Sequence, residues 1–206
     1  MKSQIEGERN QAYRDTTGIG IDAFKRVLKQ CDRSTLKGLR DYAILHLLWS
    51  NALRRNEVAT LDVKDFDPND KTLAILGKGQ AQKQIITISE PTTQAILAWL
   101  NARKTIDPNA PLFVAVSYNK NGHRVTGEAL RQLVEKYCLQ AGVTKKMSCH
   151  RIRHSSITHA LNESNDVRRV QKLSRHRKIE TLMIYDDNRT NFQGELSSML
   201  SDALEE

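Results

Sequence analysis

The chain has 206 residues, of which 39% are hydrophobic, so the composition favours one packed domain over disorder. With 32 basic and 24 acidic residues the formal net charge is +8, which favours a polyanionic partner such as nucleic acid. Three cysteines without a CxxC pair exclude a disulfide framework or a zinc cassette and indicate reduced thiols in a cytoplasmic protein.

The N-terminal part of the chain changes from a polar start to helical periodicity. Residues 1–19 have no apolar period and are predicted to be a tail or linker, and their polarity excludes a signal peptide. An apolar stripe over residues 21–30 predicts a first helix. A second helix is predicted from Ser34 to Trp49; it is apolar nearly all round, which predicts a central, buried position. A short third helix over residues 54–61 follows.

The pattern then changes to short strands separated by turn residues. Residues 62–67, 72–76 and 83–88 have strand composition, and Pro68–Asp70 and Gly77–Gly79 supply the turns between them. This region is predicted to form a small three-stranded meander.

Helical patterns return after the meander. They cover residues 92–104, 127–141, the segment around His150, 166–174 and 179–185. The predicted fold class is therefore mainly α with a small three-stranded antiparallel β-sheet.

The C-terminal segment, residues 191–206, has a different charge from the rest of the chain. From Phe192 onward it has acidic residues and no basic one, and Phe192, Leu196, Met199 and Leu200 lie at helical spacing. Such a helix either packs on its own domain or docks on a neighbouring protomer.

The stretch HRIRH, residues 150–154, allows two kinds of chemistry. His150 and His154 have the spacing of a helical zinc pair, but Arg151 and Arg153 would repel the metal and no carboxylate is present to act as a base. Arg153 instead shares a helical face with the apolar Ile157. A buried arginine needs an anion, which is either an internal carboxylate or a ligand phosphate.

A similar arrangement occurs upstream, in RRNEVATL. Arg54, Glu57, Val58 and Leu61 are predicted to share one helical face, so that an arginine again begins an inward stripe. Glu57 either neutralises Arg54 or orients it toward a shared anion. Two such arginines and a histidine would form a cage for one phosphate.

Two further residues carry a chemical and a structural interpretation. Lys78 lies in a GKG turn, where it is either a solvated lysine or a mobile one that reaches into a cleft and supplies a proton. Tyr185 follows the basic break around His176 and is either a packed aromatic residue or a nucleophile.

Together these pieces resemble the catalytic domain of the tyrosine recombinases, the family of phage integrases and Xer recombinases, over residues 20–190. The family boxes are present as ALRRNEVATL, LGKGQAQKQIITI, HRIRHSSITHAL, LSRHRKIET and TLMIYDD, in family order and at family spacing. The resemblance assigns the catalytic residues Arg54, Lys78, His150, Arg153, His176 and Tyr185, with Glu57 in support.

The resemblance implies how the basic residues would act on DNA. Arg54 and Arg153 would clamp the non-bridging oxygens of one phosphate and stabilise charge in the transition state. His150 and His176 would add hydrogen bonds, and His150 would help to accept the proton of the nucleophile.

The resemblance also implies a covalent intermediate. Tyr185 would attack the phosphorus to form a 3′-phosphotyrosyl link, and Lys78 would protonate the leaving 5′ oxygen. The link keeps the bond energy, so no cofactor, metal or ATP is implied. The implied partners are double-stranded DNA and further copies of the chain, as a homotetramer on DNA.

Three departures from the family pattern affect these expectations. The family usually has glycine before the late histidine, where this chain has Arg175, which either alters the local turn or adds a phosphate contact. Lys83 is a second lysine in the hairpin of Lys78. Full-length members also have a helical DNA-binding domain ahead of this one, so the chain is expected to be a catalytic fragment or a protein without that clamp.

Two other functions fit parts of the pattern. One is relaxation of DNA of the type IB topoisomerase kind, without exchange of partners. The other is a DNA-binding regulator with an inactive site. Retained binding and lost cleavage on Tyr185→Phe would separate the enzyme from the regulator.

Overall fold

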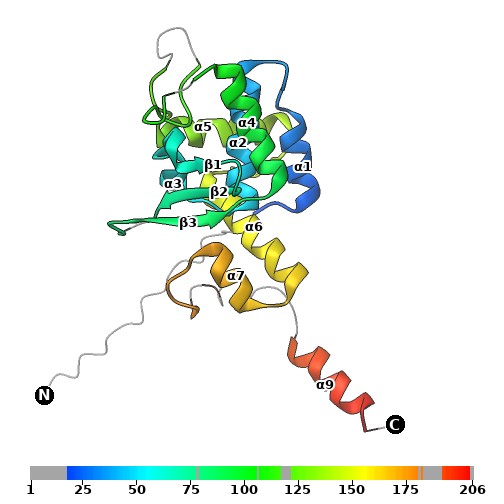
Figure 1. Cartoon of the computed structure of the whole chain (residues 1–206). Coiled ribbons are helices and arrows are strands. Elements are labelled where there is room, and N and C mark those ends of the chain that lie inside the picture. Colours follow the sequence, from blue (N-terminus) through cyan, green and yellow to red (C-terminus); the bar gives the residue numbers. More distant parts are fainter. Residues whose placement is uncertain are drawn as a thin grey trace, which may run out of the picture.

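A computed structural model describes residues 18–77, 79–105, 107–116, 122–180, 182 and 192–204. Figure 1 shows a helical body with a small sheet on one side. The helices are α1 (Ile21–Lys29), α2 (Leu36–Ser50), α3 (Arg55–Ala59), the 3₁₀ helix η1 (Val63–Asp65), α4 (Glu90–Arg103), α5 (Gly127–Gln140), α6 (Cys149–Ser164), α7 (Val167–Ser174) and α9 (Phe192–Asp202). The strands are β1 (Phe66–Asp67), β2 (Thr72–Leu76) and β3 (Lys83–Thr87). The predicted fold class is confirmed.

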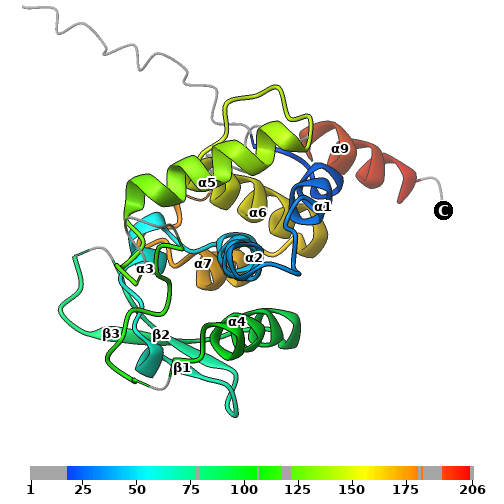
Figure 2. The ribbon, with the colours of Figure 1, turned by 90° about the horizontal axis from the view of Figure 1, so that it is seen from above.

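Helix α2 is the centre of the body, as its all-round apolar sequence predicts. The Thr35 side chain caps its start by accepting a hydrogen bond from the Gly38 amide at 3.0 Å. Ile44, Leu45 and Leu48 are fully buried, and each such side chain stabilises the fold by about 1.5–3 kcal/mol. The helix packs against α4 and α6, and the view along it in Figure 2 shows the other helices around it.

The sheet is the predicted meander, with strand order β1-β2-β3 and antiparallel pairs throughout. The prediction of a strand over residues 62–67 is wrong for its first half. Asp62 and Asp65 form a capping box, in which the Asp65 carboxylate accepts from the Asp62 amide at 2.8 Å, and this favours η1 over an extended chain. Only Phe66 and Asp67 pair with β2.

Two turns with left-handed backbone bring the site together. The chain leaves α2 through Ala52, which has a φ of 46°, and leaves α7 through Arg175, which has a φ of 56°. Few side chains adopt this conformation easily, so each turn has to be held by its surroundings. Ala52 packs in a small buried cluster with Ile157 of α6 and Leu182, which brings these segments next to the α2–α3 turn.

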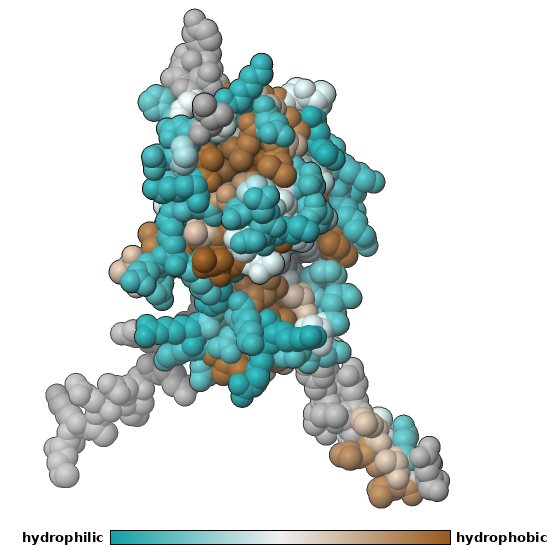
Figure 3. Space-filling view, in the orientation of Figure 1, coloured by the Kyte–Doolittle hydropathy of each residue, from teal (hydrophilic) through white to brown (hydrophobic). Residues whose placement is uncertain are grey.

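Helix α9 extends away from the body, whereas the other labelled helices pack together (Figure 1). Its side chains Met199 and Leu200 are each 69% exposed, and Figure 3 shows apolar surface on this helix. None of the helices in the described residues is both long enough and apolar enough to cross a membrane.

Candidate active site

Arg54 stands at the start of α3, where Glu57 fixes it. The prediction that Arg54 lies within the helical stripe is wrong in detail, because the helix begins at Arg55 and Arg54 is its N-cap residue. One Glu57 oxygen accepts from the Arg54 amide and the other pairs with the Arg54 guanidinium, both at 2.7 Å. Glu57 is buried, while about a third of the Arg54 side chain is exposed. The carboxylate therefore holds Arg54 and leaves part of its guanidinium accessible.

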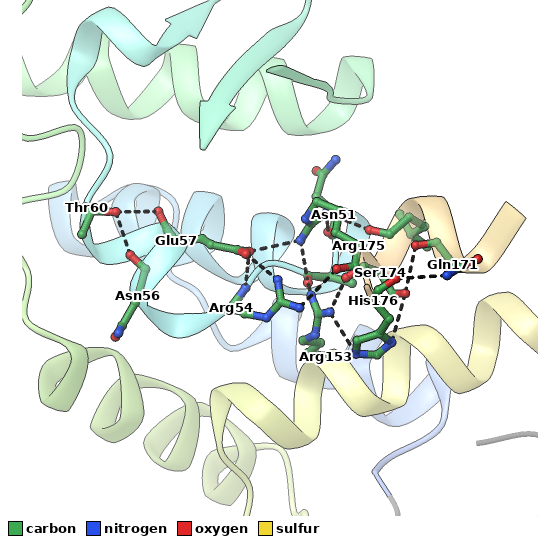
Figure 4. Close-up of polar contacts among 12 residues, drawn as sticks. Asn51, Arg54, Asn56, Glu57, Thr60, Arg153, Gln171, Ser174, Arg175 and His176 are labelled. Atoms are coloured by element: carbon green, nitrogen blue, oxygen red, sulfur yellow. Dashed lines mark hydrogen bonds and ion pairs between the residues drawn. The ribbon is translucent and has the colours of Figure 1, made fainter. Parts of the chain in front are cut away.

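Arg153 projects from α6 into the space between the two left-handed turns (Figure 4). The residue is 2% exposed. Its guanidinium donates to the carbonyl oxygens of Ala52 and Ser174 and lies 3.3 Å from the Nε2 atom of His176. The two carbonyl oxygens and the imidazole hold the guanidinium in place at the cavity. A guanidinium that is held in place is well suited to bind an anion such as phosphate.

His176 follows the turn at Arg175 and is oriented by a short hydrogen-bond chain. Arg153 has only N–H groups to offer, so Nε2 of His176 accepts. Nδ1 then carries the proton and faces the Ser174 hydroxyl at 3.2 Å. Burial, followed by the nearby Arg153 and Arg54 charges, lowers the pKa of His176 to about 4. This histidine is therefore neutral near pH 7 in the free protein.

His150 lies at the first turn of α6 and faces the same space. Ser148 caps this helix by accepting from the Arg151 amide at 3.3 Å. Burial, together with Arg153 and Arg54, lowers the pKa of His150 below its ordinary value. A neutral imidazole at this position is able to accept a proton.

Four of the six predicted catalytic residues lie on one cavity of about 730 Å³. They are Arg54, His150, Arg153 and His176. Arg55 and Arg131 also line it, and sequence reasoning missed both. Arg55 lies in the ALRRNEVATL box, but the resemblance assigns a role only to its neighbour Arg54, and Arg131 lies in no family box. Among the described residues that line the cavity, Glu57 is the one carboxylate. The cavity is thus strongly cationic and suits a phosphate in charge and in hydrogen-bond donors.

The other two predicted residues, Lys78 and Tyr185, lie outside the described residues, as do most of the predicted helix over residues 179–185 and residues 1–17 of the predicted tail. Gly77 and Gly79, on either side of Lys78, line the cavity. Lys83 is held by the Asp65 carboxylate, with its Nζ atom 2.6 Å from both oxygens. This ion pair holds Lys83, the first residue of β3 after the turn, to η1.

The cavity has the donors of an anion site. In the part of the chain that the structure describes, no three His, Cys, Asp or Glu side chains gather in a way that could hold a metal ion.

Comparisons with known proteins show similarity in sequence and in fold. The sequence profile described as "Phage integrase family" matches residues 21–191. The chain is 46% identical over 201 residues to "Tyrosine recombinase slr0733" of Synechocystis sp. (strain ATCC 27184 / PCC 6803 / Kazusa), which covers 97% of this chain and 64% of the relative. It is 43% identical over 202 residues to "Tyrosine recombinase Synpcc7942_B2651" of Synechococcus elongatus (strain ATCC 33912 / PCC 7942 / FACHB-805), with 97% and 63% covered. The chain therefore spans less than two thirds of the length of these relatives.

Solved structures share the fold at lower sequence identity. The post-cleavage complex of XerH site-specific recombinase with a palindromic difH substrate has a TM-score of 0.75 and 21% identity, over 94% of this chain and 56% of that one. The crystal structure of XerA recombinase has a TM-score of 0.70 and 23% identity, over 91% and 65%.

Proposed function

The chain belongs to the phage integrase family, and from that membership we propose that it is the catalytic part of a site-specific DNA recombinase of the tyrosine type. The observation that carries the proposal is the convergence of Arg54, Arg153, His150 and His176 on one cationic cavity. Relatives named tyrosine recombinases and DNA-bound recombinases of the same fold support it. The net charge of +8 suits a domain that holds DNA and predicts steep salt dependence of binding.

In the proposed reaction the two arginines bind the scissile phosphate. A phosphodiester repels nucleophiles because it is negatively charged, and the charge grows in the transition state. Arg54, held by Glu57, and Arg153, held by two carbonyls, present guanidinium groups that need little reorganisation. Each such donor contributes about 10²- to 10³-fold to the rate.

In the covalent step the phenol oxygen of Tyr185 attacks phosphorus and the bond to the 5′ oxygen breaks. His150 accepts the phenol proton, and Lys78 gives a proton to the departing 5′ oxygen. A 5′ hydroxyl of another strand then attacks the phosphotyrosine and releases Tyr185. One phosphodiester is exchanged for another, so the sequence of steps needs no metal and no ATP.

The histidines are neutral in the free protein, and a bound phosphate would change this. The negative charge of the phosphate would raise the pKa of His176, because it favours the protonated ring. A protonated His176 would then be a hydrogen-bond donor to the phosphate rather than an acceptor from Arg153.

The test is covalent capture on nicked duplexes from the DNA around the gene, in EDTA, analysed on denaturing gels. We expect a protein–DNA band with the wild type and none with Tyr185→Phe, while both bind the duplex. A different outcome is that the wild type and Tyr185→Phe both bind DNA and neither gives the band, also when each is joined to an N-terminal DNA-binding domain. That outcome would favour a DNA-binding regulator over an enzyme. Relaxation of supercoiled plasmid without exchange between two sites would indicate the topoisomerase-like activity.

The role of Lys78 has its own test, with Lys83 as the matched control. When sulfur replaces the 5′ bridging oxygen of the substrate, the leaving group departs as a thiolate and needs no proton. We expect Lys78→Ala to cleave the normal substrate slowly and the sulfur substrate at the wild-type rate. Lys83→Ala removes a lysine that is paired with Asp65, so its cleavage rate relative to the wild type should be the same on the two substrates. Equal slowing of Lys78→Ala on both substrates would contradict the assignment.

We also propose that residues 191–206 dock on a neighbouring protomer in a tetramer on DNA. The exposed Met199, Leu200 and Leu204 of this segment support the proposal. Removal of residues 192–206 should leave covalent capture by single protomers intact and abolish higher complexes in sedimentation with DNA.

A further inference from the structure

Arg175 ends α7 in a conformation that does not suit an arginine. Its φ of 56° and ψ of 36° lie in the left-handed region, which glycine adopts most easily. Its side chain is only 9% exposed, and its buried Nε atom has no hydrogen-bond partner. A strained backbone and an unsatisfied donor both oppose folding, so the rest of the side chain must provide a compensating interaction or a function.

The guanidinium of Arg175 joins three segments of the site. Its Nη1 atom donates to the Leu173 carbonyl at 2.7 Å and to the Asn51 carbonyl at 3.0 Å. Its Nη2 atom donates to the Ala52 carbonyl and to Glu57, both at 3.1 Å. The end of α7, the turn after α2 and the first turn of α3 are therefore tied together by one side chain (Figure 4).

The contact with Glu57 changes the charge that the site presents. Glu57 binds the Arg54 guanidinium through one oxygen, and its other oxygen accepts from both Arg175 and the Arg54 amide. The guanidinium groups of Arg175 and Arg153 both donate to the Ala52 carbonyl, so these two cations lie side by side. If Glu57 paired with Arg54 alone, the charge of Arg54 would be largely neutralised. Sharing Glu57 keeps Arg54 attractive to a phosphate.

The backbone of Arg175 also contributes. Its carbonyl accepts from the Arg54 guanidinium at 3.5 Å, and the next residue is His176. Arg175 does not line the cavity, so its guanidinium is not a phosphate contact. Of the two expectations raised by an arginine in place of glycine, the structure does not favour the phosphate contact, and the turn keeps the left-handed backbone that glycine adopts most easily.

We propose that Arg175 is a positioning residue, which fixes Arg54 through a shared Glu57 and His176 through the turn that it closes. The inference rests on the proposed function, because the reaction gives the fixed groups their purpose. It predicts that Arg175→Gly relaxes the backbone yet weakens the site.

The experiment compares Arg175→Gly and Arg175→Lys with the wild type, and uses Arg169→Ala as the control for a lost positive charge on α7. Arg169 is exposed and pairs only weakly with Asp166, at 3.8 Å. Thermal unfolding establishes that each variant is folded. NMR of labelled arginine and histidine side chains follows binding of inorganic sulfate at the site and needs no DNA. Single-turnover cleavage at saturating nicked duplex follows the reaction.

We expect Arg175→Gly to unfold at or above the wild-type temperature, to bind sulfate more weakly and to cleave about ten- to a hundredfold more slowly. Arg175→Lys keeps the charge without the forked contacts. Its sulfate affinity and cleavage rate should lie between those of Arg175→Gly and the wild type. Glu57→Gln should slow cleavage less in the Arg175→Gly background than in the wild type, because the two residues act together. Arg169→Ala should match the wild type in all three measurements.

Arg175→Gly with wild-type sulfate affinity and wild-type cleavage would overturn the proposal and leave Arg175 as a helix end only. Weaker sulfate binding by Arg175→Gly would support the positioning role even if the wild type cleaved no duplex. The absence of cleavage would then count against the recombinase function and not against the role of Arg175.

Discussion

Among the described residues, a cluster of buried arginine and carboxylate around Asp41 and another around Glu57 differ in how their charges are used. In the first, Asp41 of α2 accepts from Arg40 through one oxygen and from Lys37 and Tyr137 through the other. Arg40 donates its remaining end to the Val114 carbonyl at 2.8 Å. In this cluster one buried guanidinium faces one buried carboxylate, inside the core.

The second cluster has the same residue types in a different proportion. Glu57 is shared between Arg54 and Arg175, and Arg153 relies on carbonyls and His176. This cluster also borders a cavity, whereas Arg40 and Asp41 do not line it. A buried pair with matched charges is a structural feature, while an excess of guanidinium groups at a cavity is suited to an anion.

The largest effect on stability is expected at the first cluster. Asp41→Asn leaves Arg40 buried without its counter-charge, which should lower the free energy of unfolding by about 3–5 kcal/mol. Urea unfolding measures this loss. The folded fraction should still cleave DNA at the wild-type rate, and a defect in cleavage by folded protein would contradict the assignment of this cluster to structure alone.

Of the residues in the two clusters, Arg153 is expected to have the largest effect on activity. Arg153→Lys keeps a positive charge but cannot reach the Ala52 and Ser174 carbonyls and a phosphate at the same time. We expect cleavage to fall about 10²- to 10³-fold at saturating DNA. Single-turnover gels measure the rate, and Arg40→Lys is the matched control, which should lose stability and keep its rate when folded.

The two clusters also differ in how well the sequence predicts them. Arg54 and Arg153 are recognisable because each precedes an apolar stripe in a family box, as Arg153 precedes Ile157. Arg40 and Asp41 lie within an apolar helix, and their partners Tyr137 and Val114 are distant in sequence. Local periodicity therefore predicts α2 but not its buried ion pair, which depends on the packing of other segments.

Some details of the site also depend on backbone geometry that the sequence does not reveal. Arg54 is an N-cap residue and not a helical one, because Glu57 folds back onto its amide. Arg175 turns inward, because a left-handed backbone directs it toward the α2–α3 turn. The roles of Lys78 and Tyr185 stay predictions, since both lie outside the described residues.

Sulfate should stabilise a variant that lacks Glu57 more than a variant that lacks Asp41. Glu57→Gln removes the carboxylate that Arg54 and Arg175 share, which should destabilise the fold by about 1–3 kcal/mol. Sulfate binds the folded state and should restore stability as its concentration rises above the dissociation constant. Thermal unfolding in sulfate measures this. Sulfate should stabilise Asp41→Asn no more than it stabilises the wild type. Equal stabilisation of Glu57→Gln and Asp41→Asn by sulfate would contradict the proposed difference between the clusters.

The smallest expected effect is the pH dependence that His176 contributes. Its pKa is about 4 in the folded protein and 6.5 in the ordinary state, so the unfolded chain binds the proton more readily between these values. The stability contributed by the neutral ring is therefore complete above pH 6.5 and is lost as the pH falls toward 4. His176 is partly accessible to solvent, so the loss should be about 1 kcal/mol.

His176→Gln should flatten the stability profile between pH 6.5 and 4, as measured by urea unfolding at several pH values. His46, whose ring nitrogens are buried away from the cavity and whose pKa is also lowered, is the comparison, since its contribution should not respond to sulfate. Sulfate in the cavity should raise the pKa of His176 and so reduce the acid loss in the wild type. An acid loss that sulfate leaves unchanged would mean that the anion does not bind beside His176.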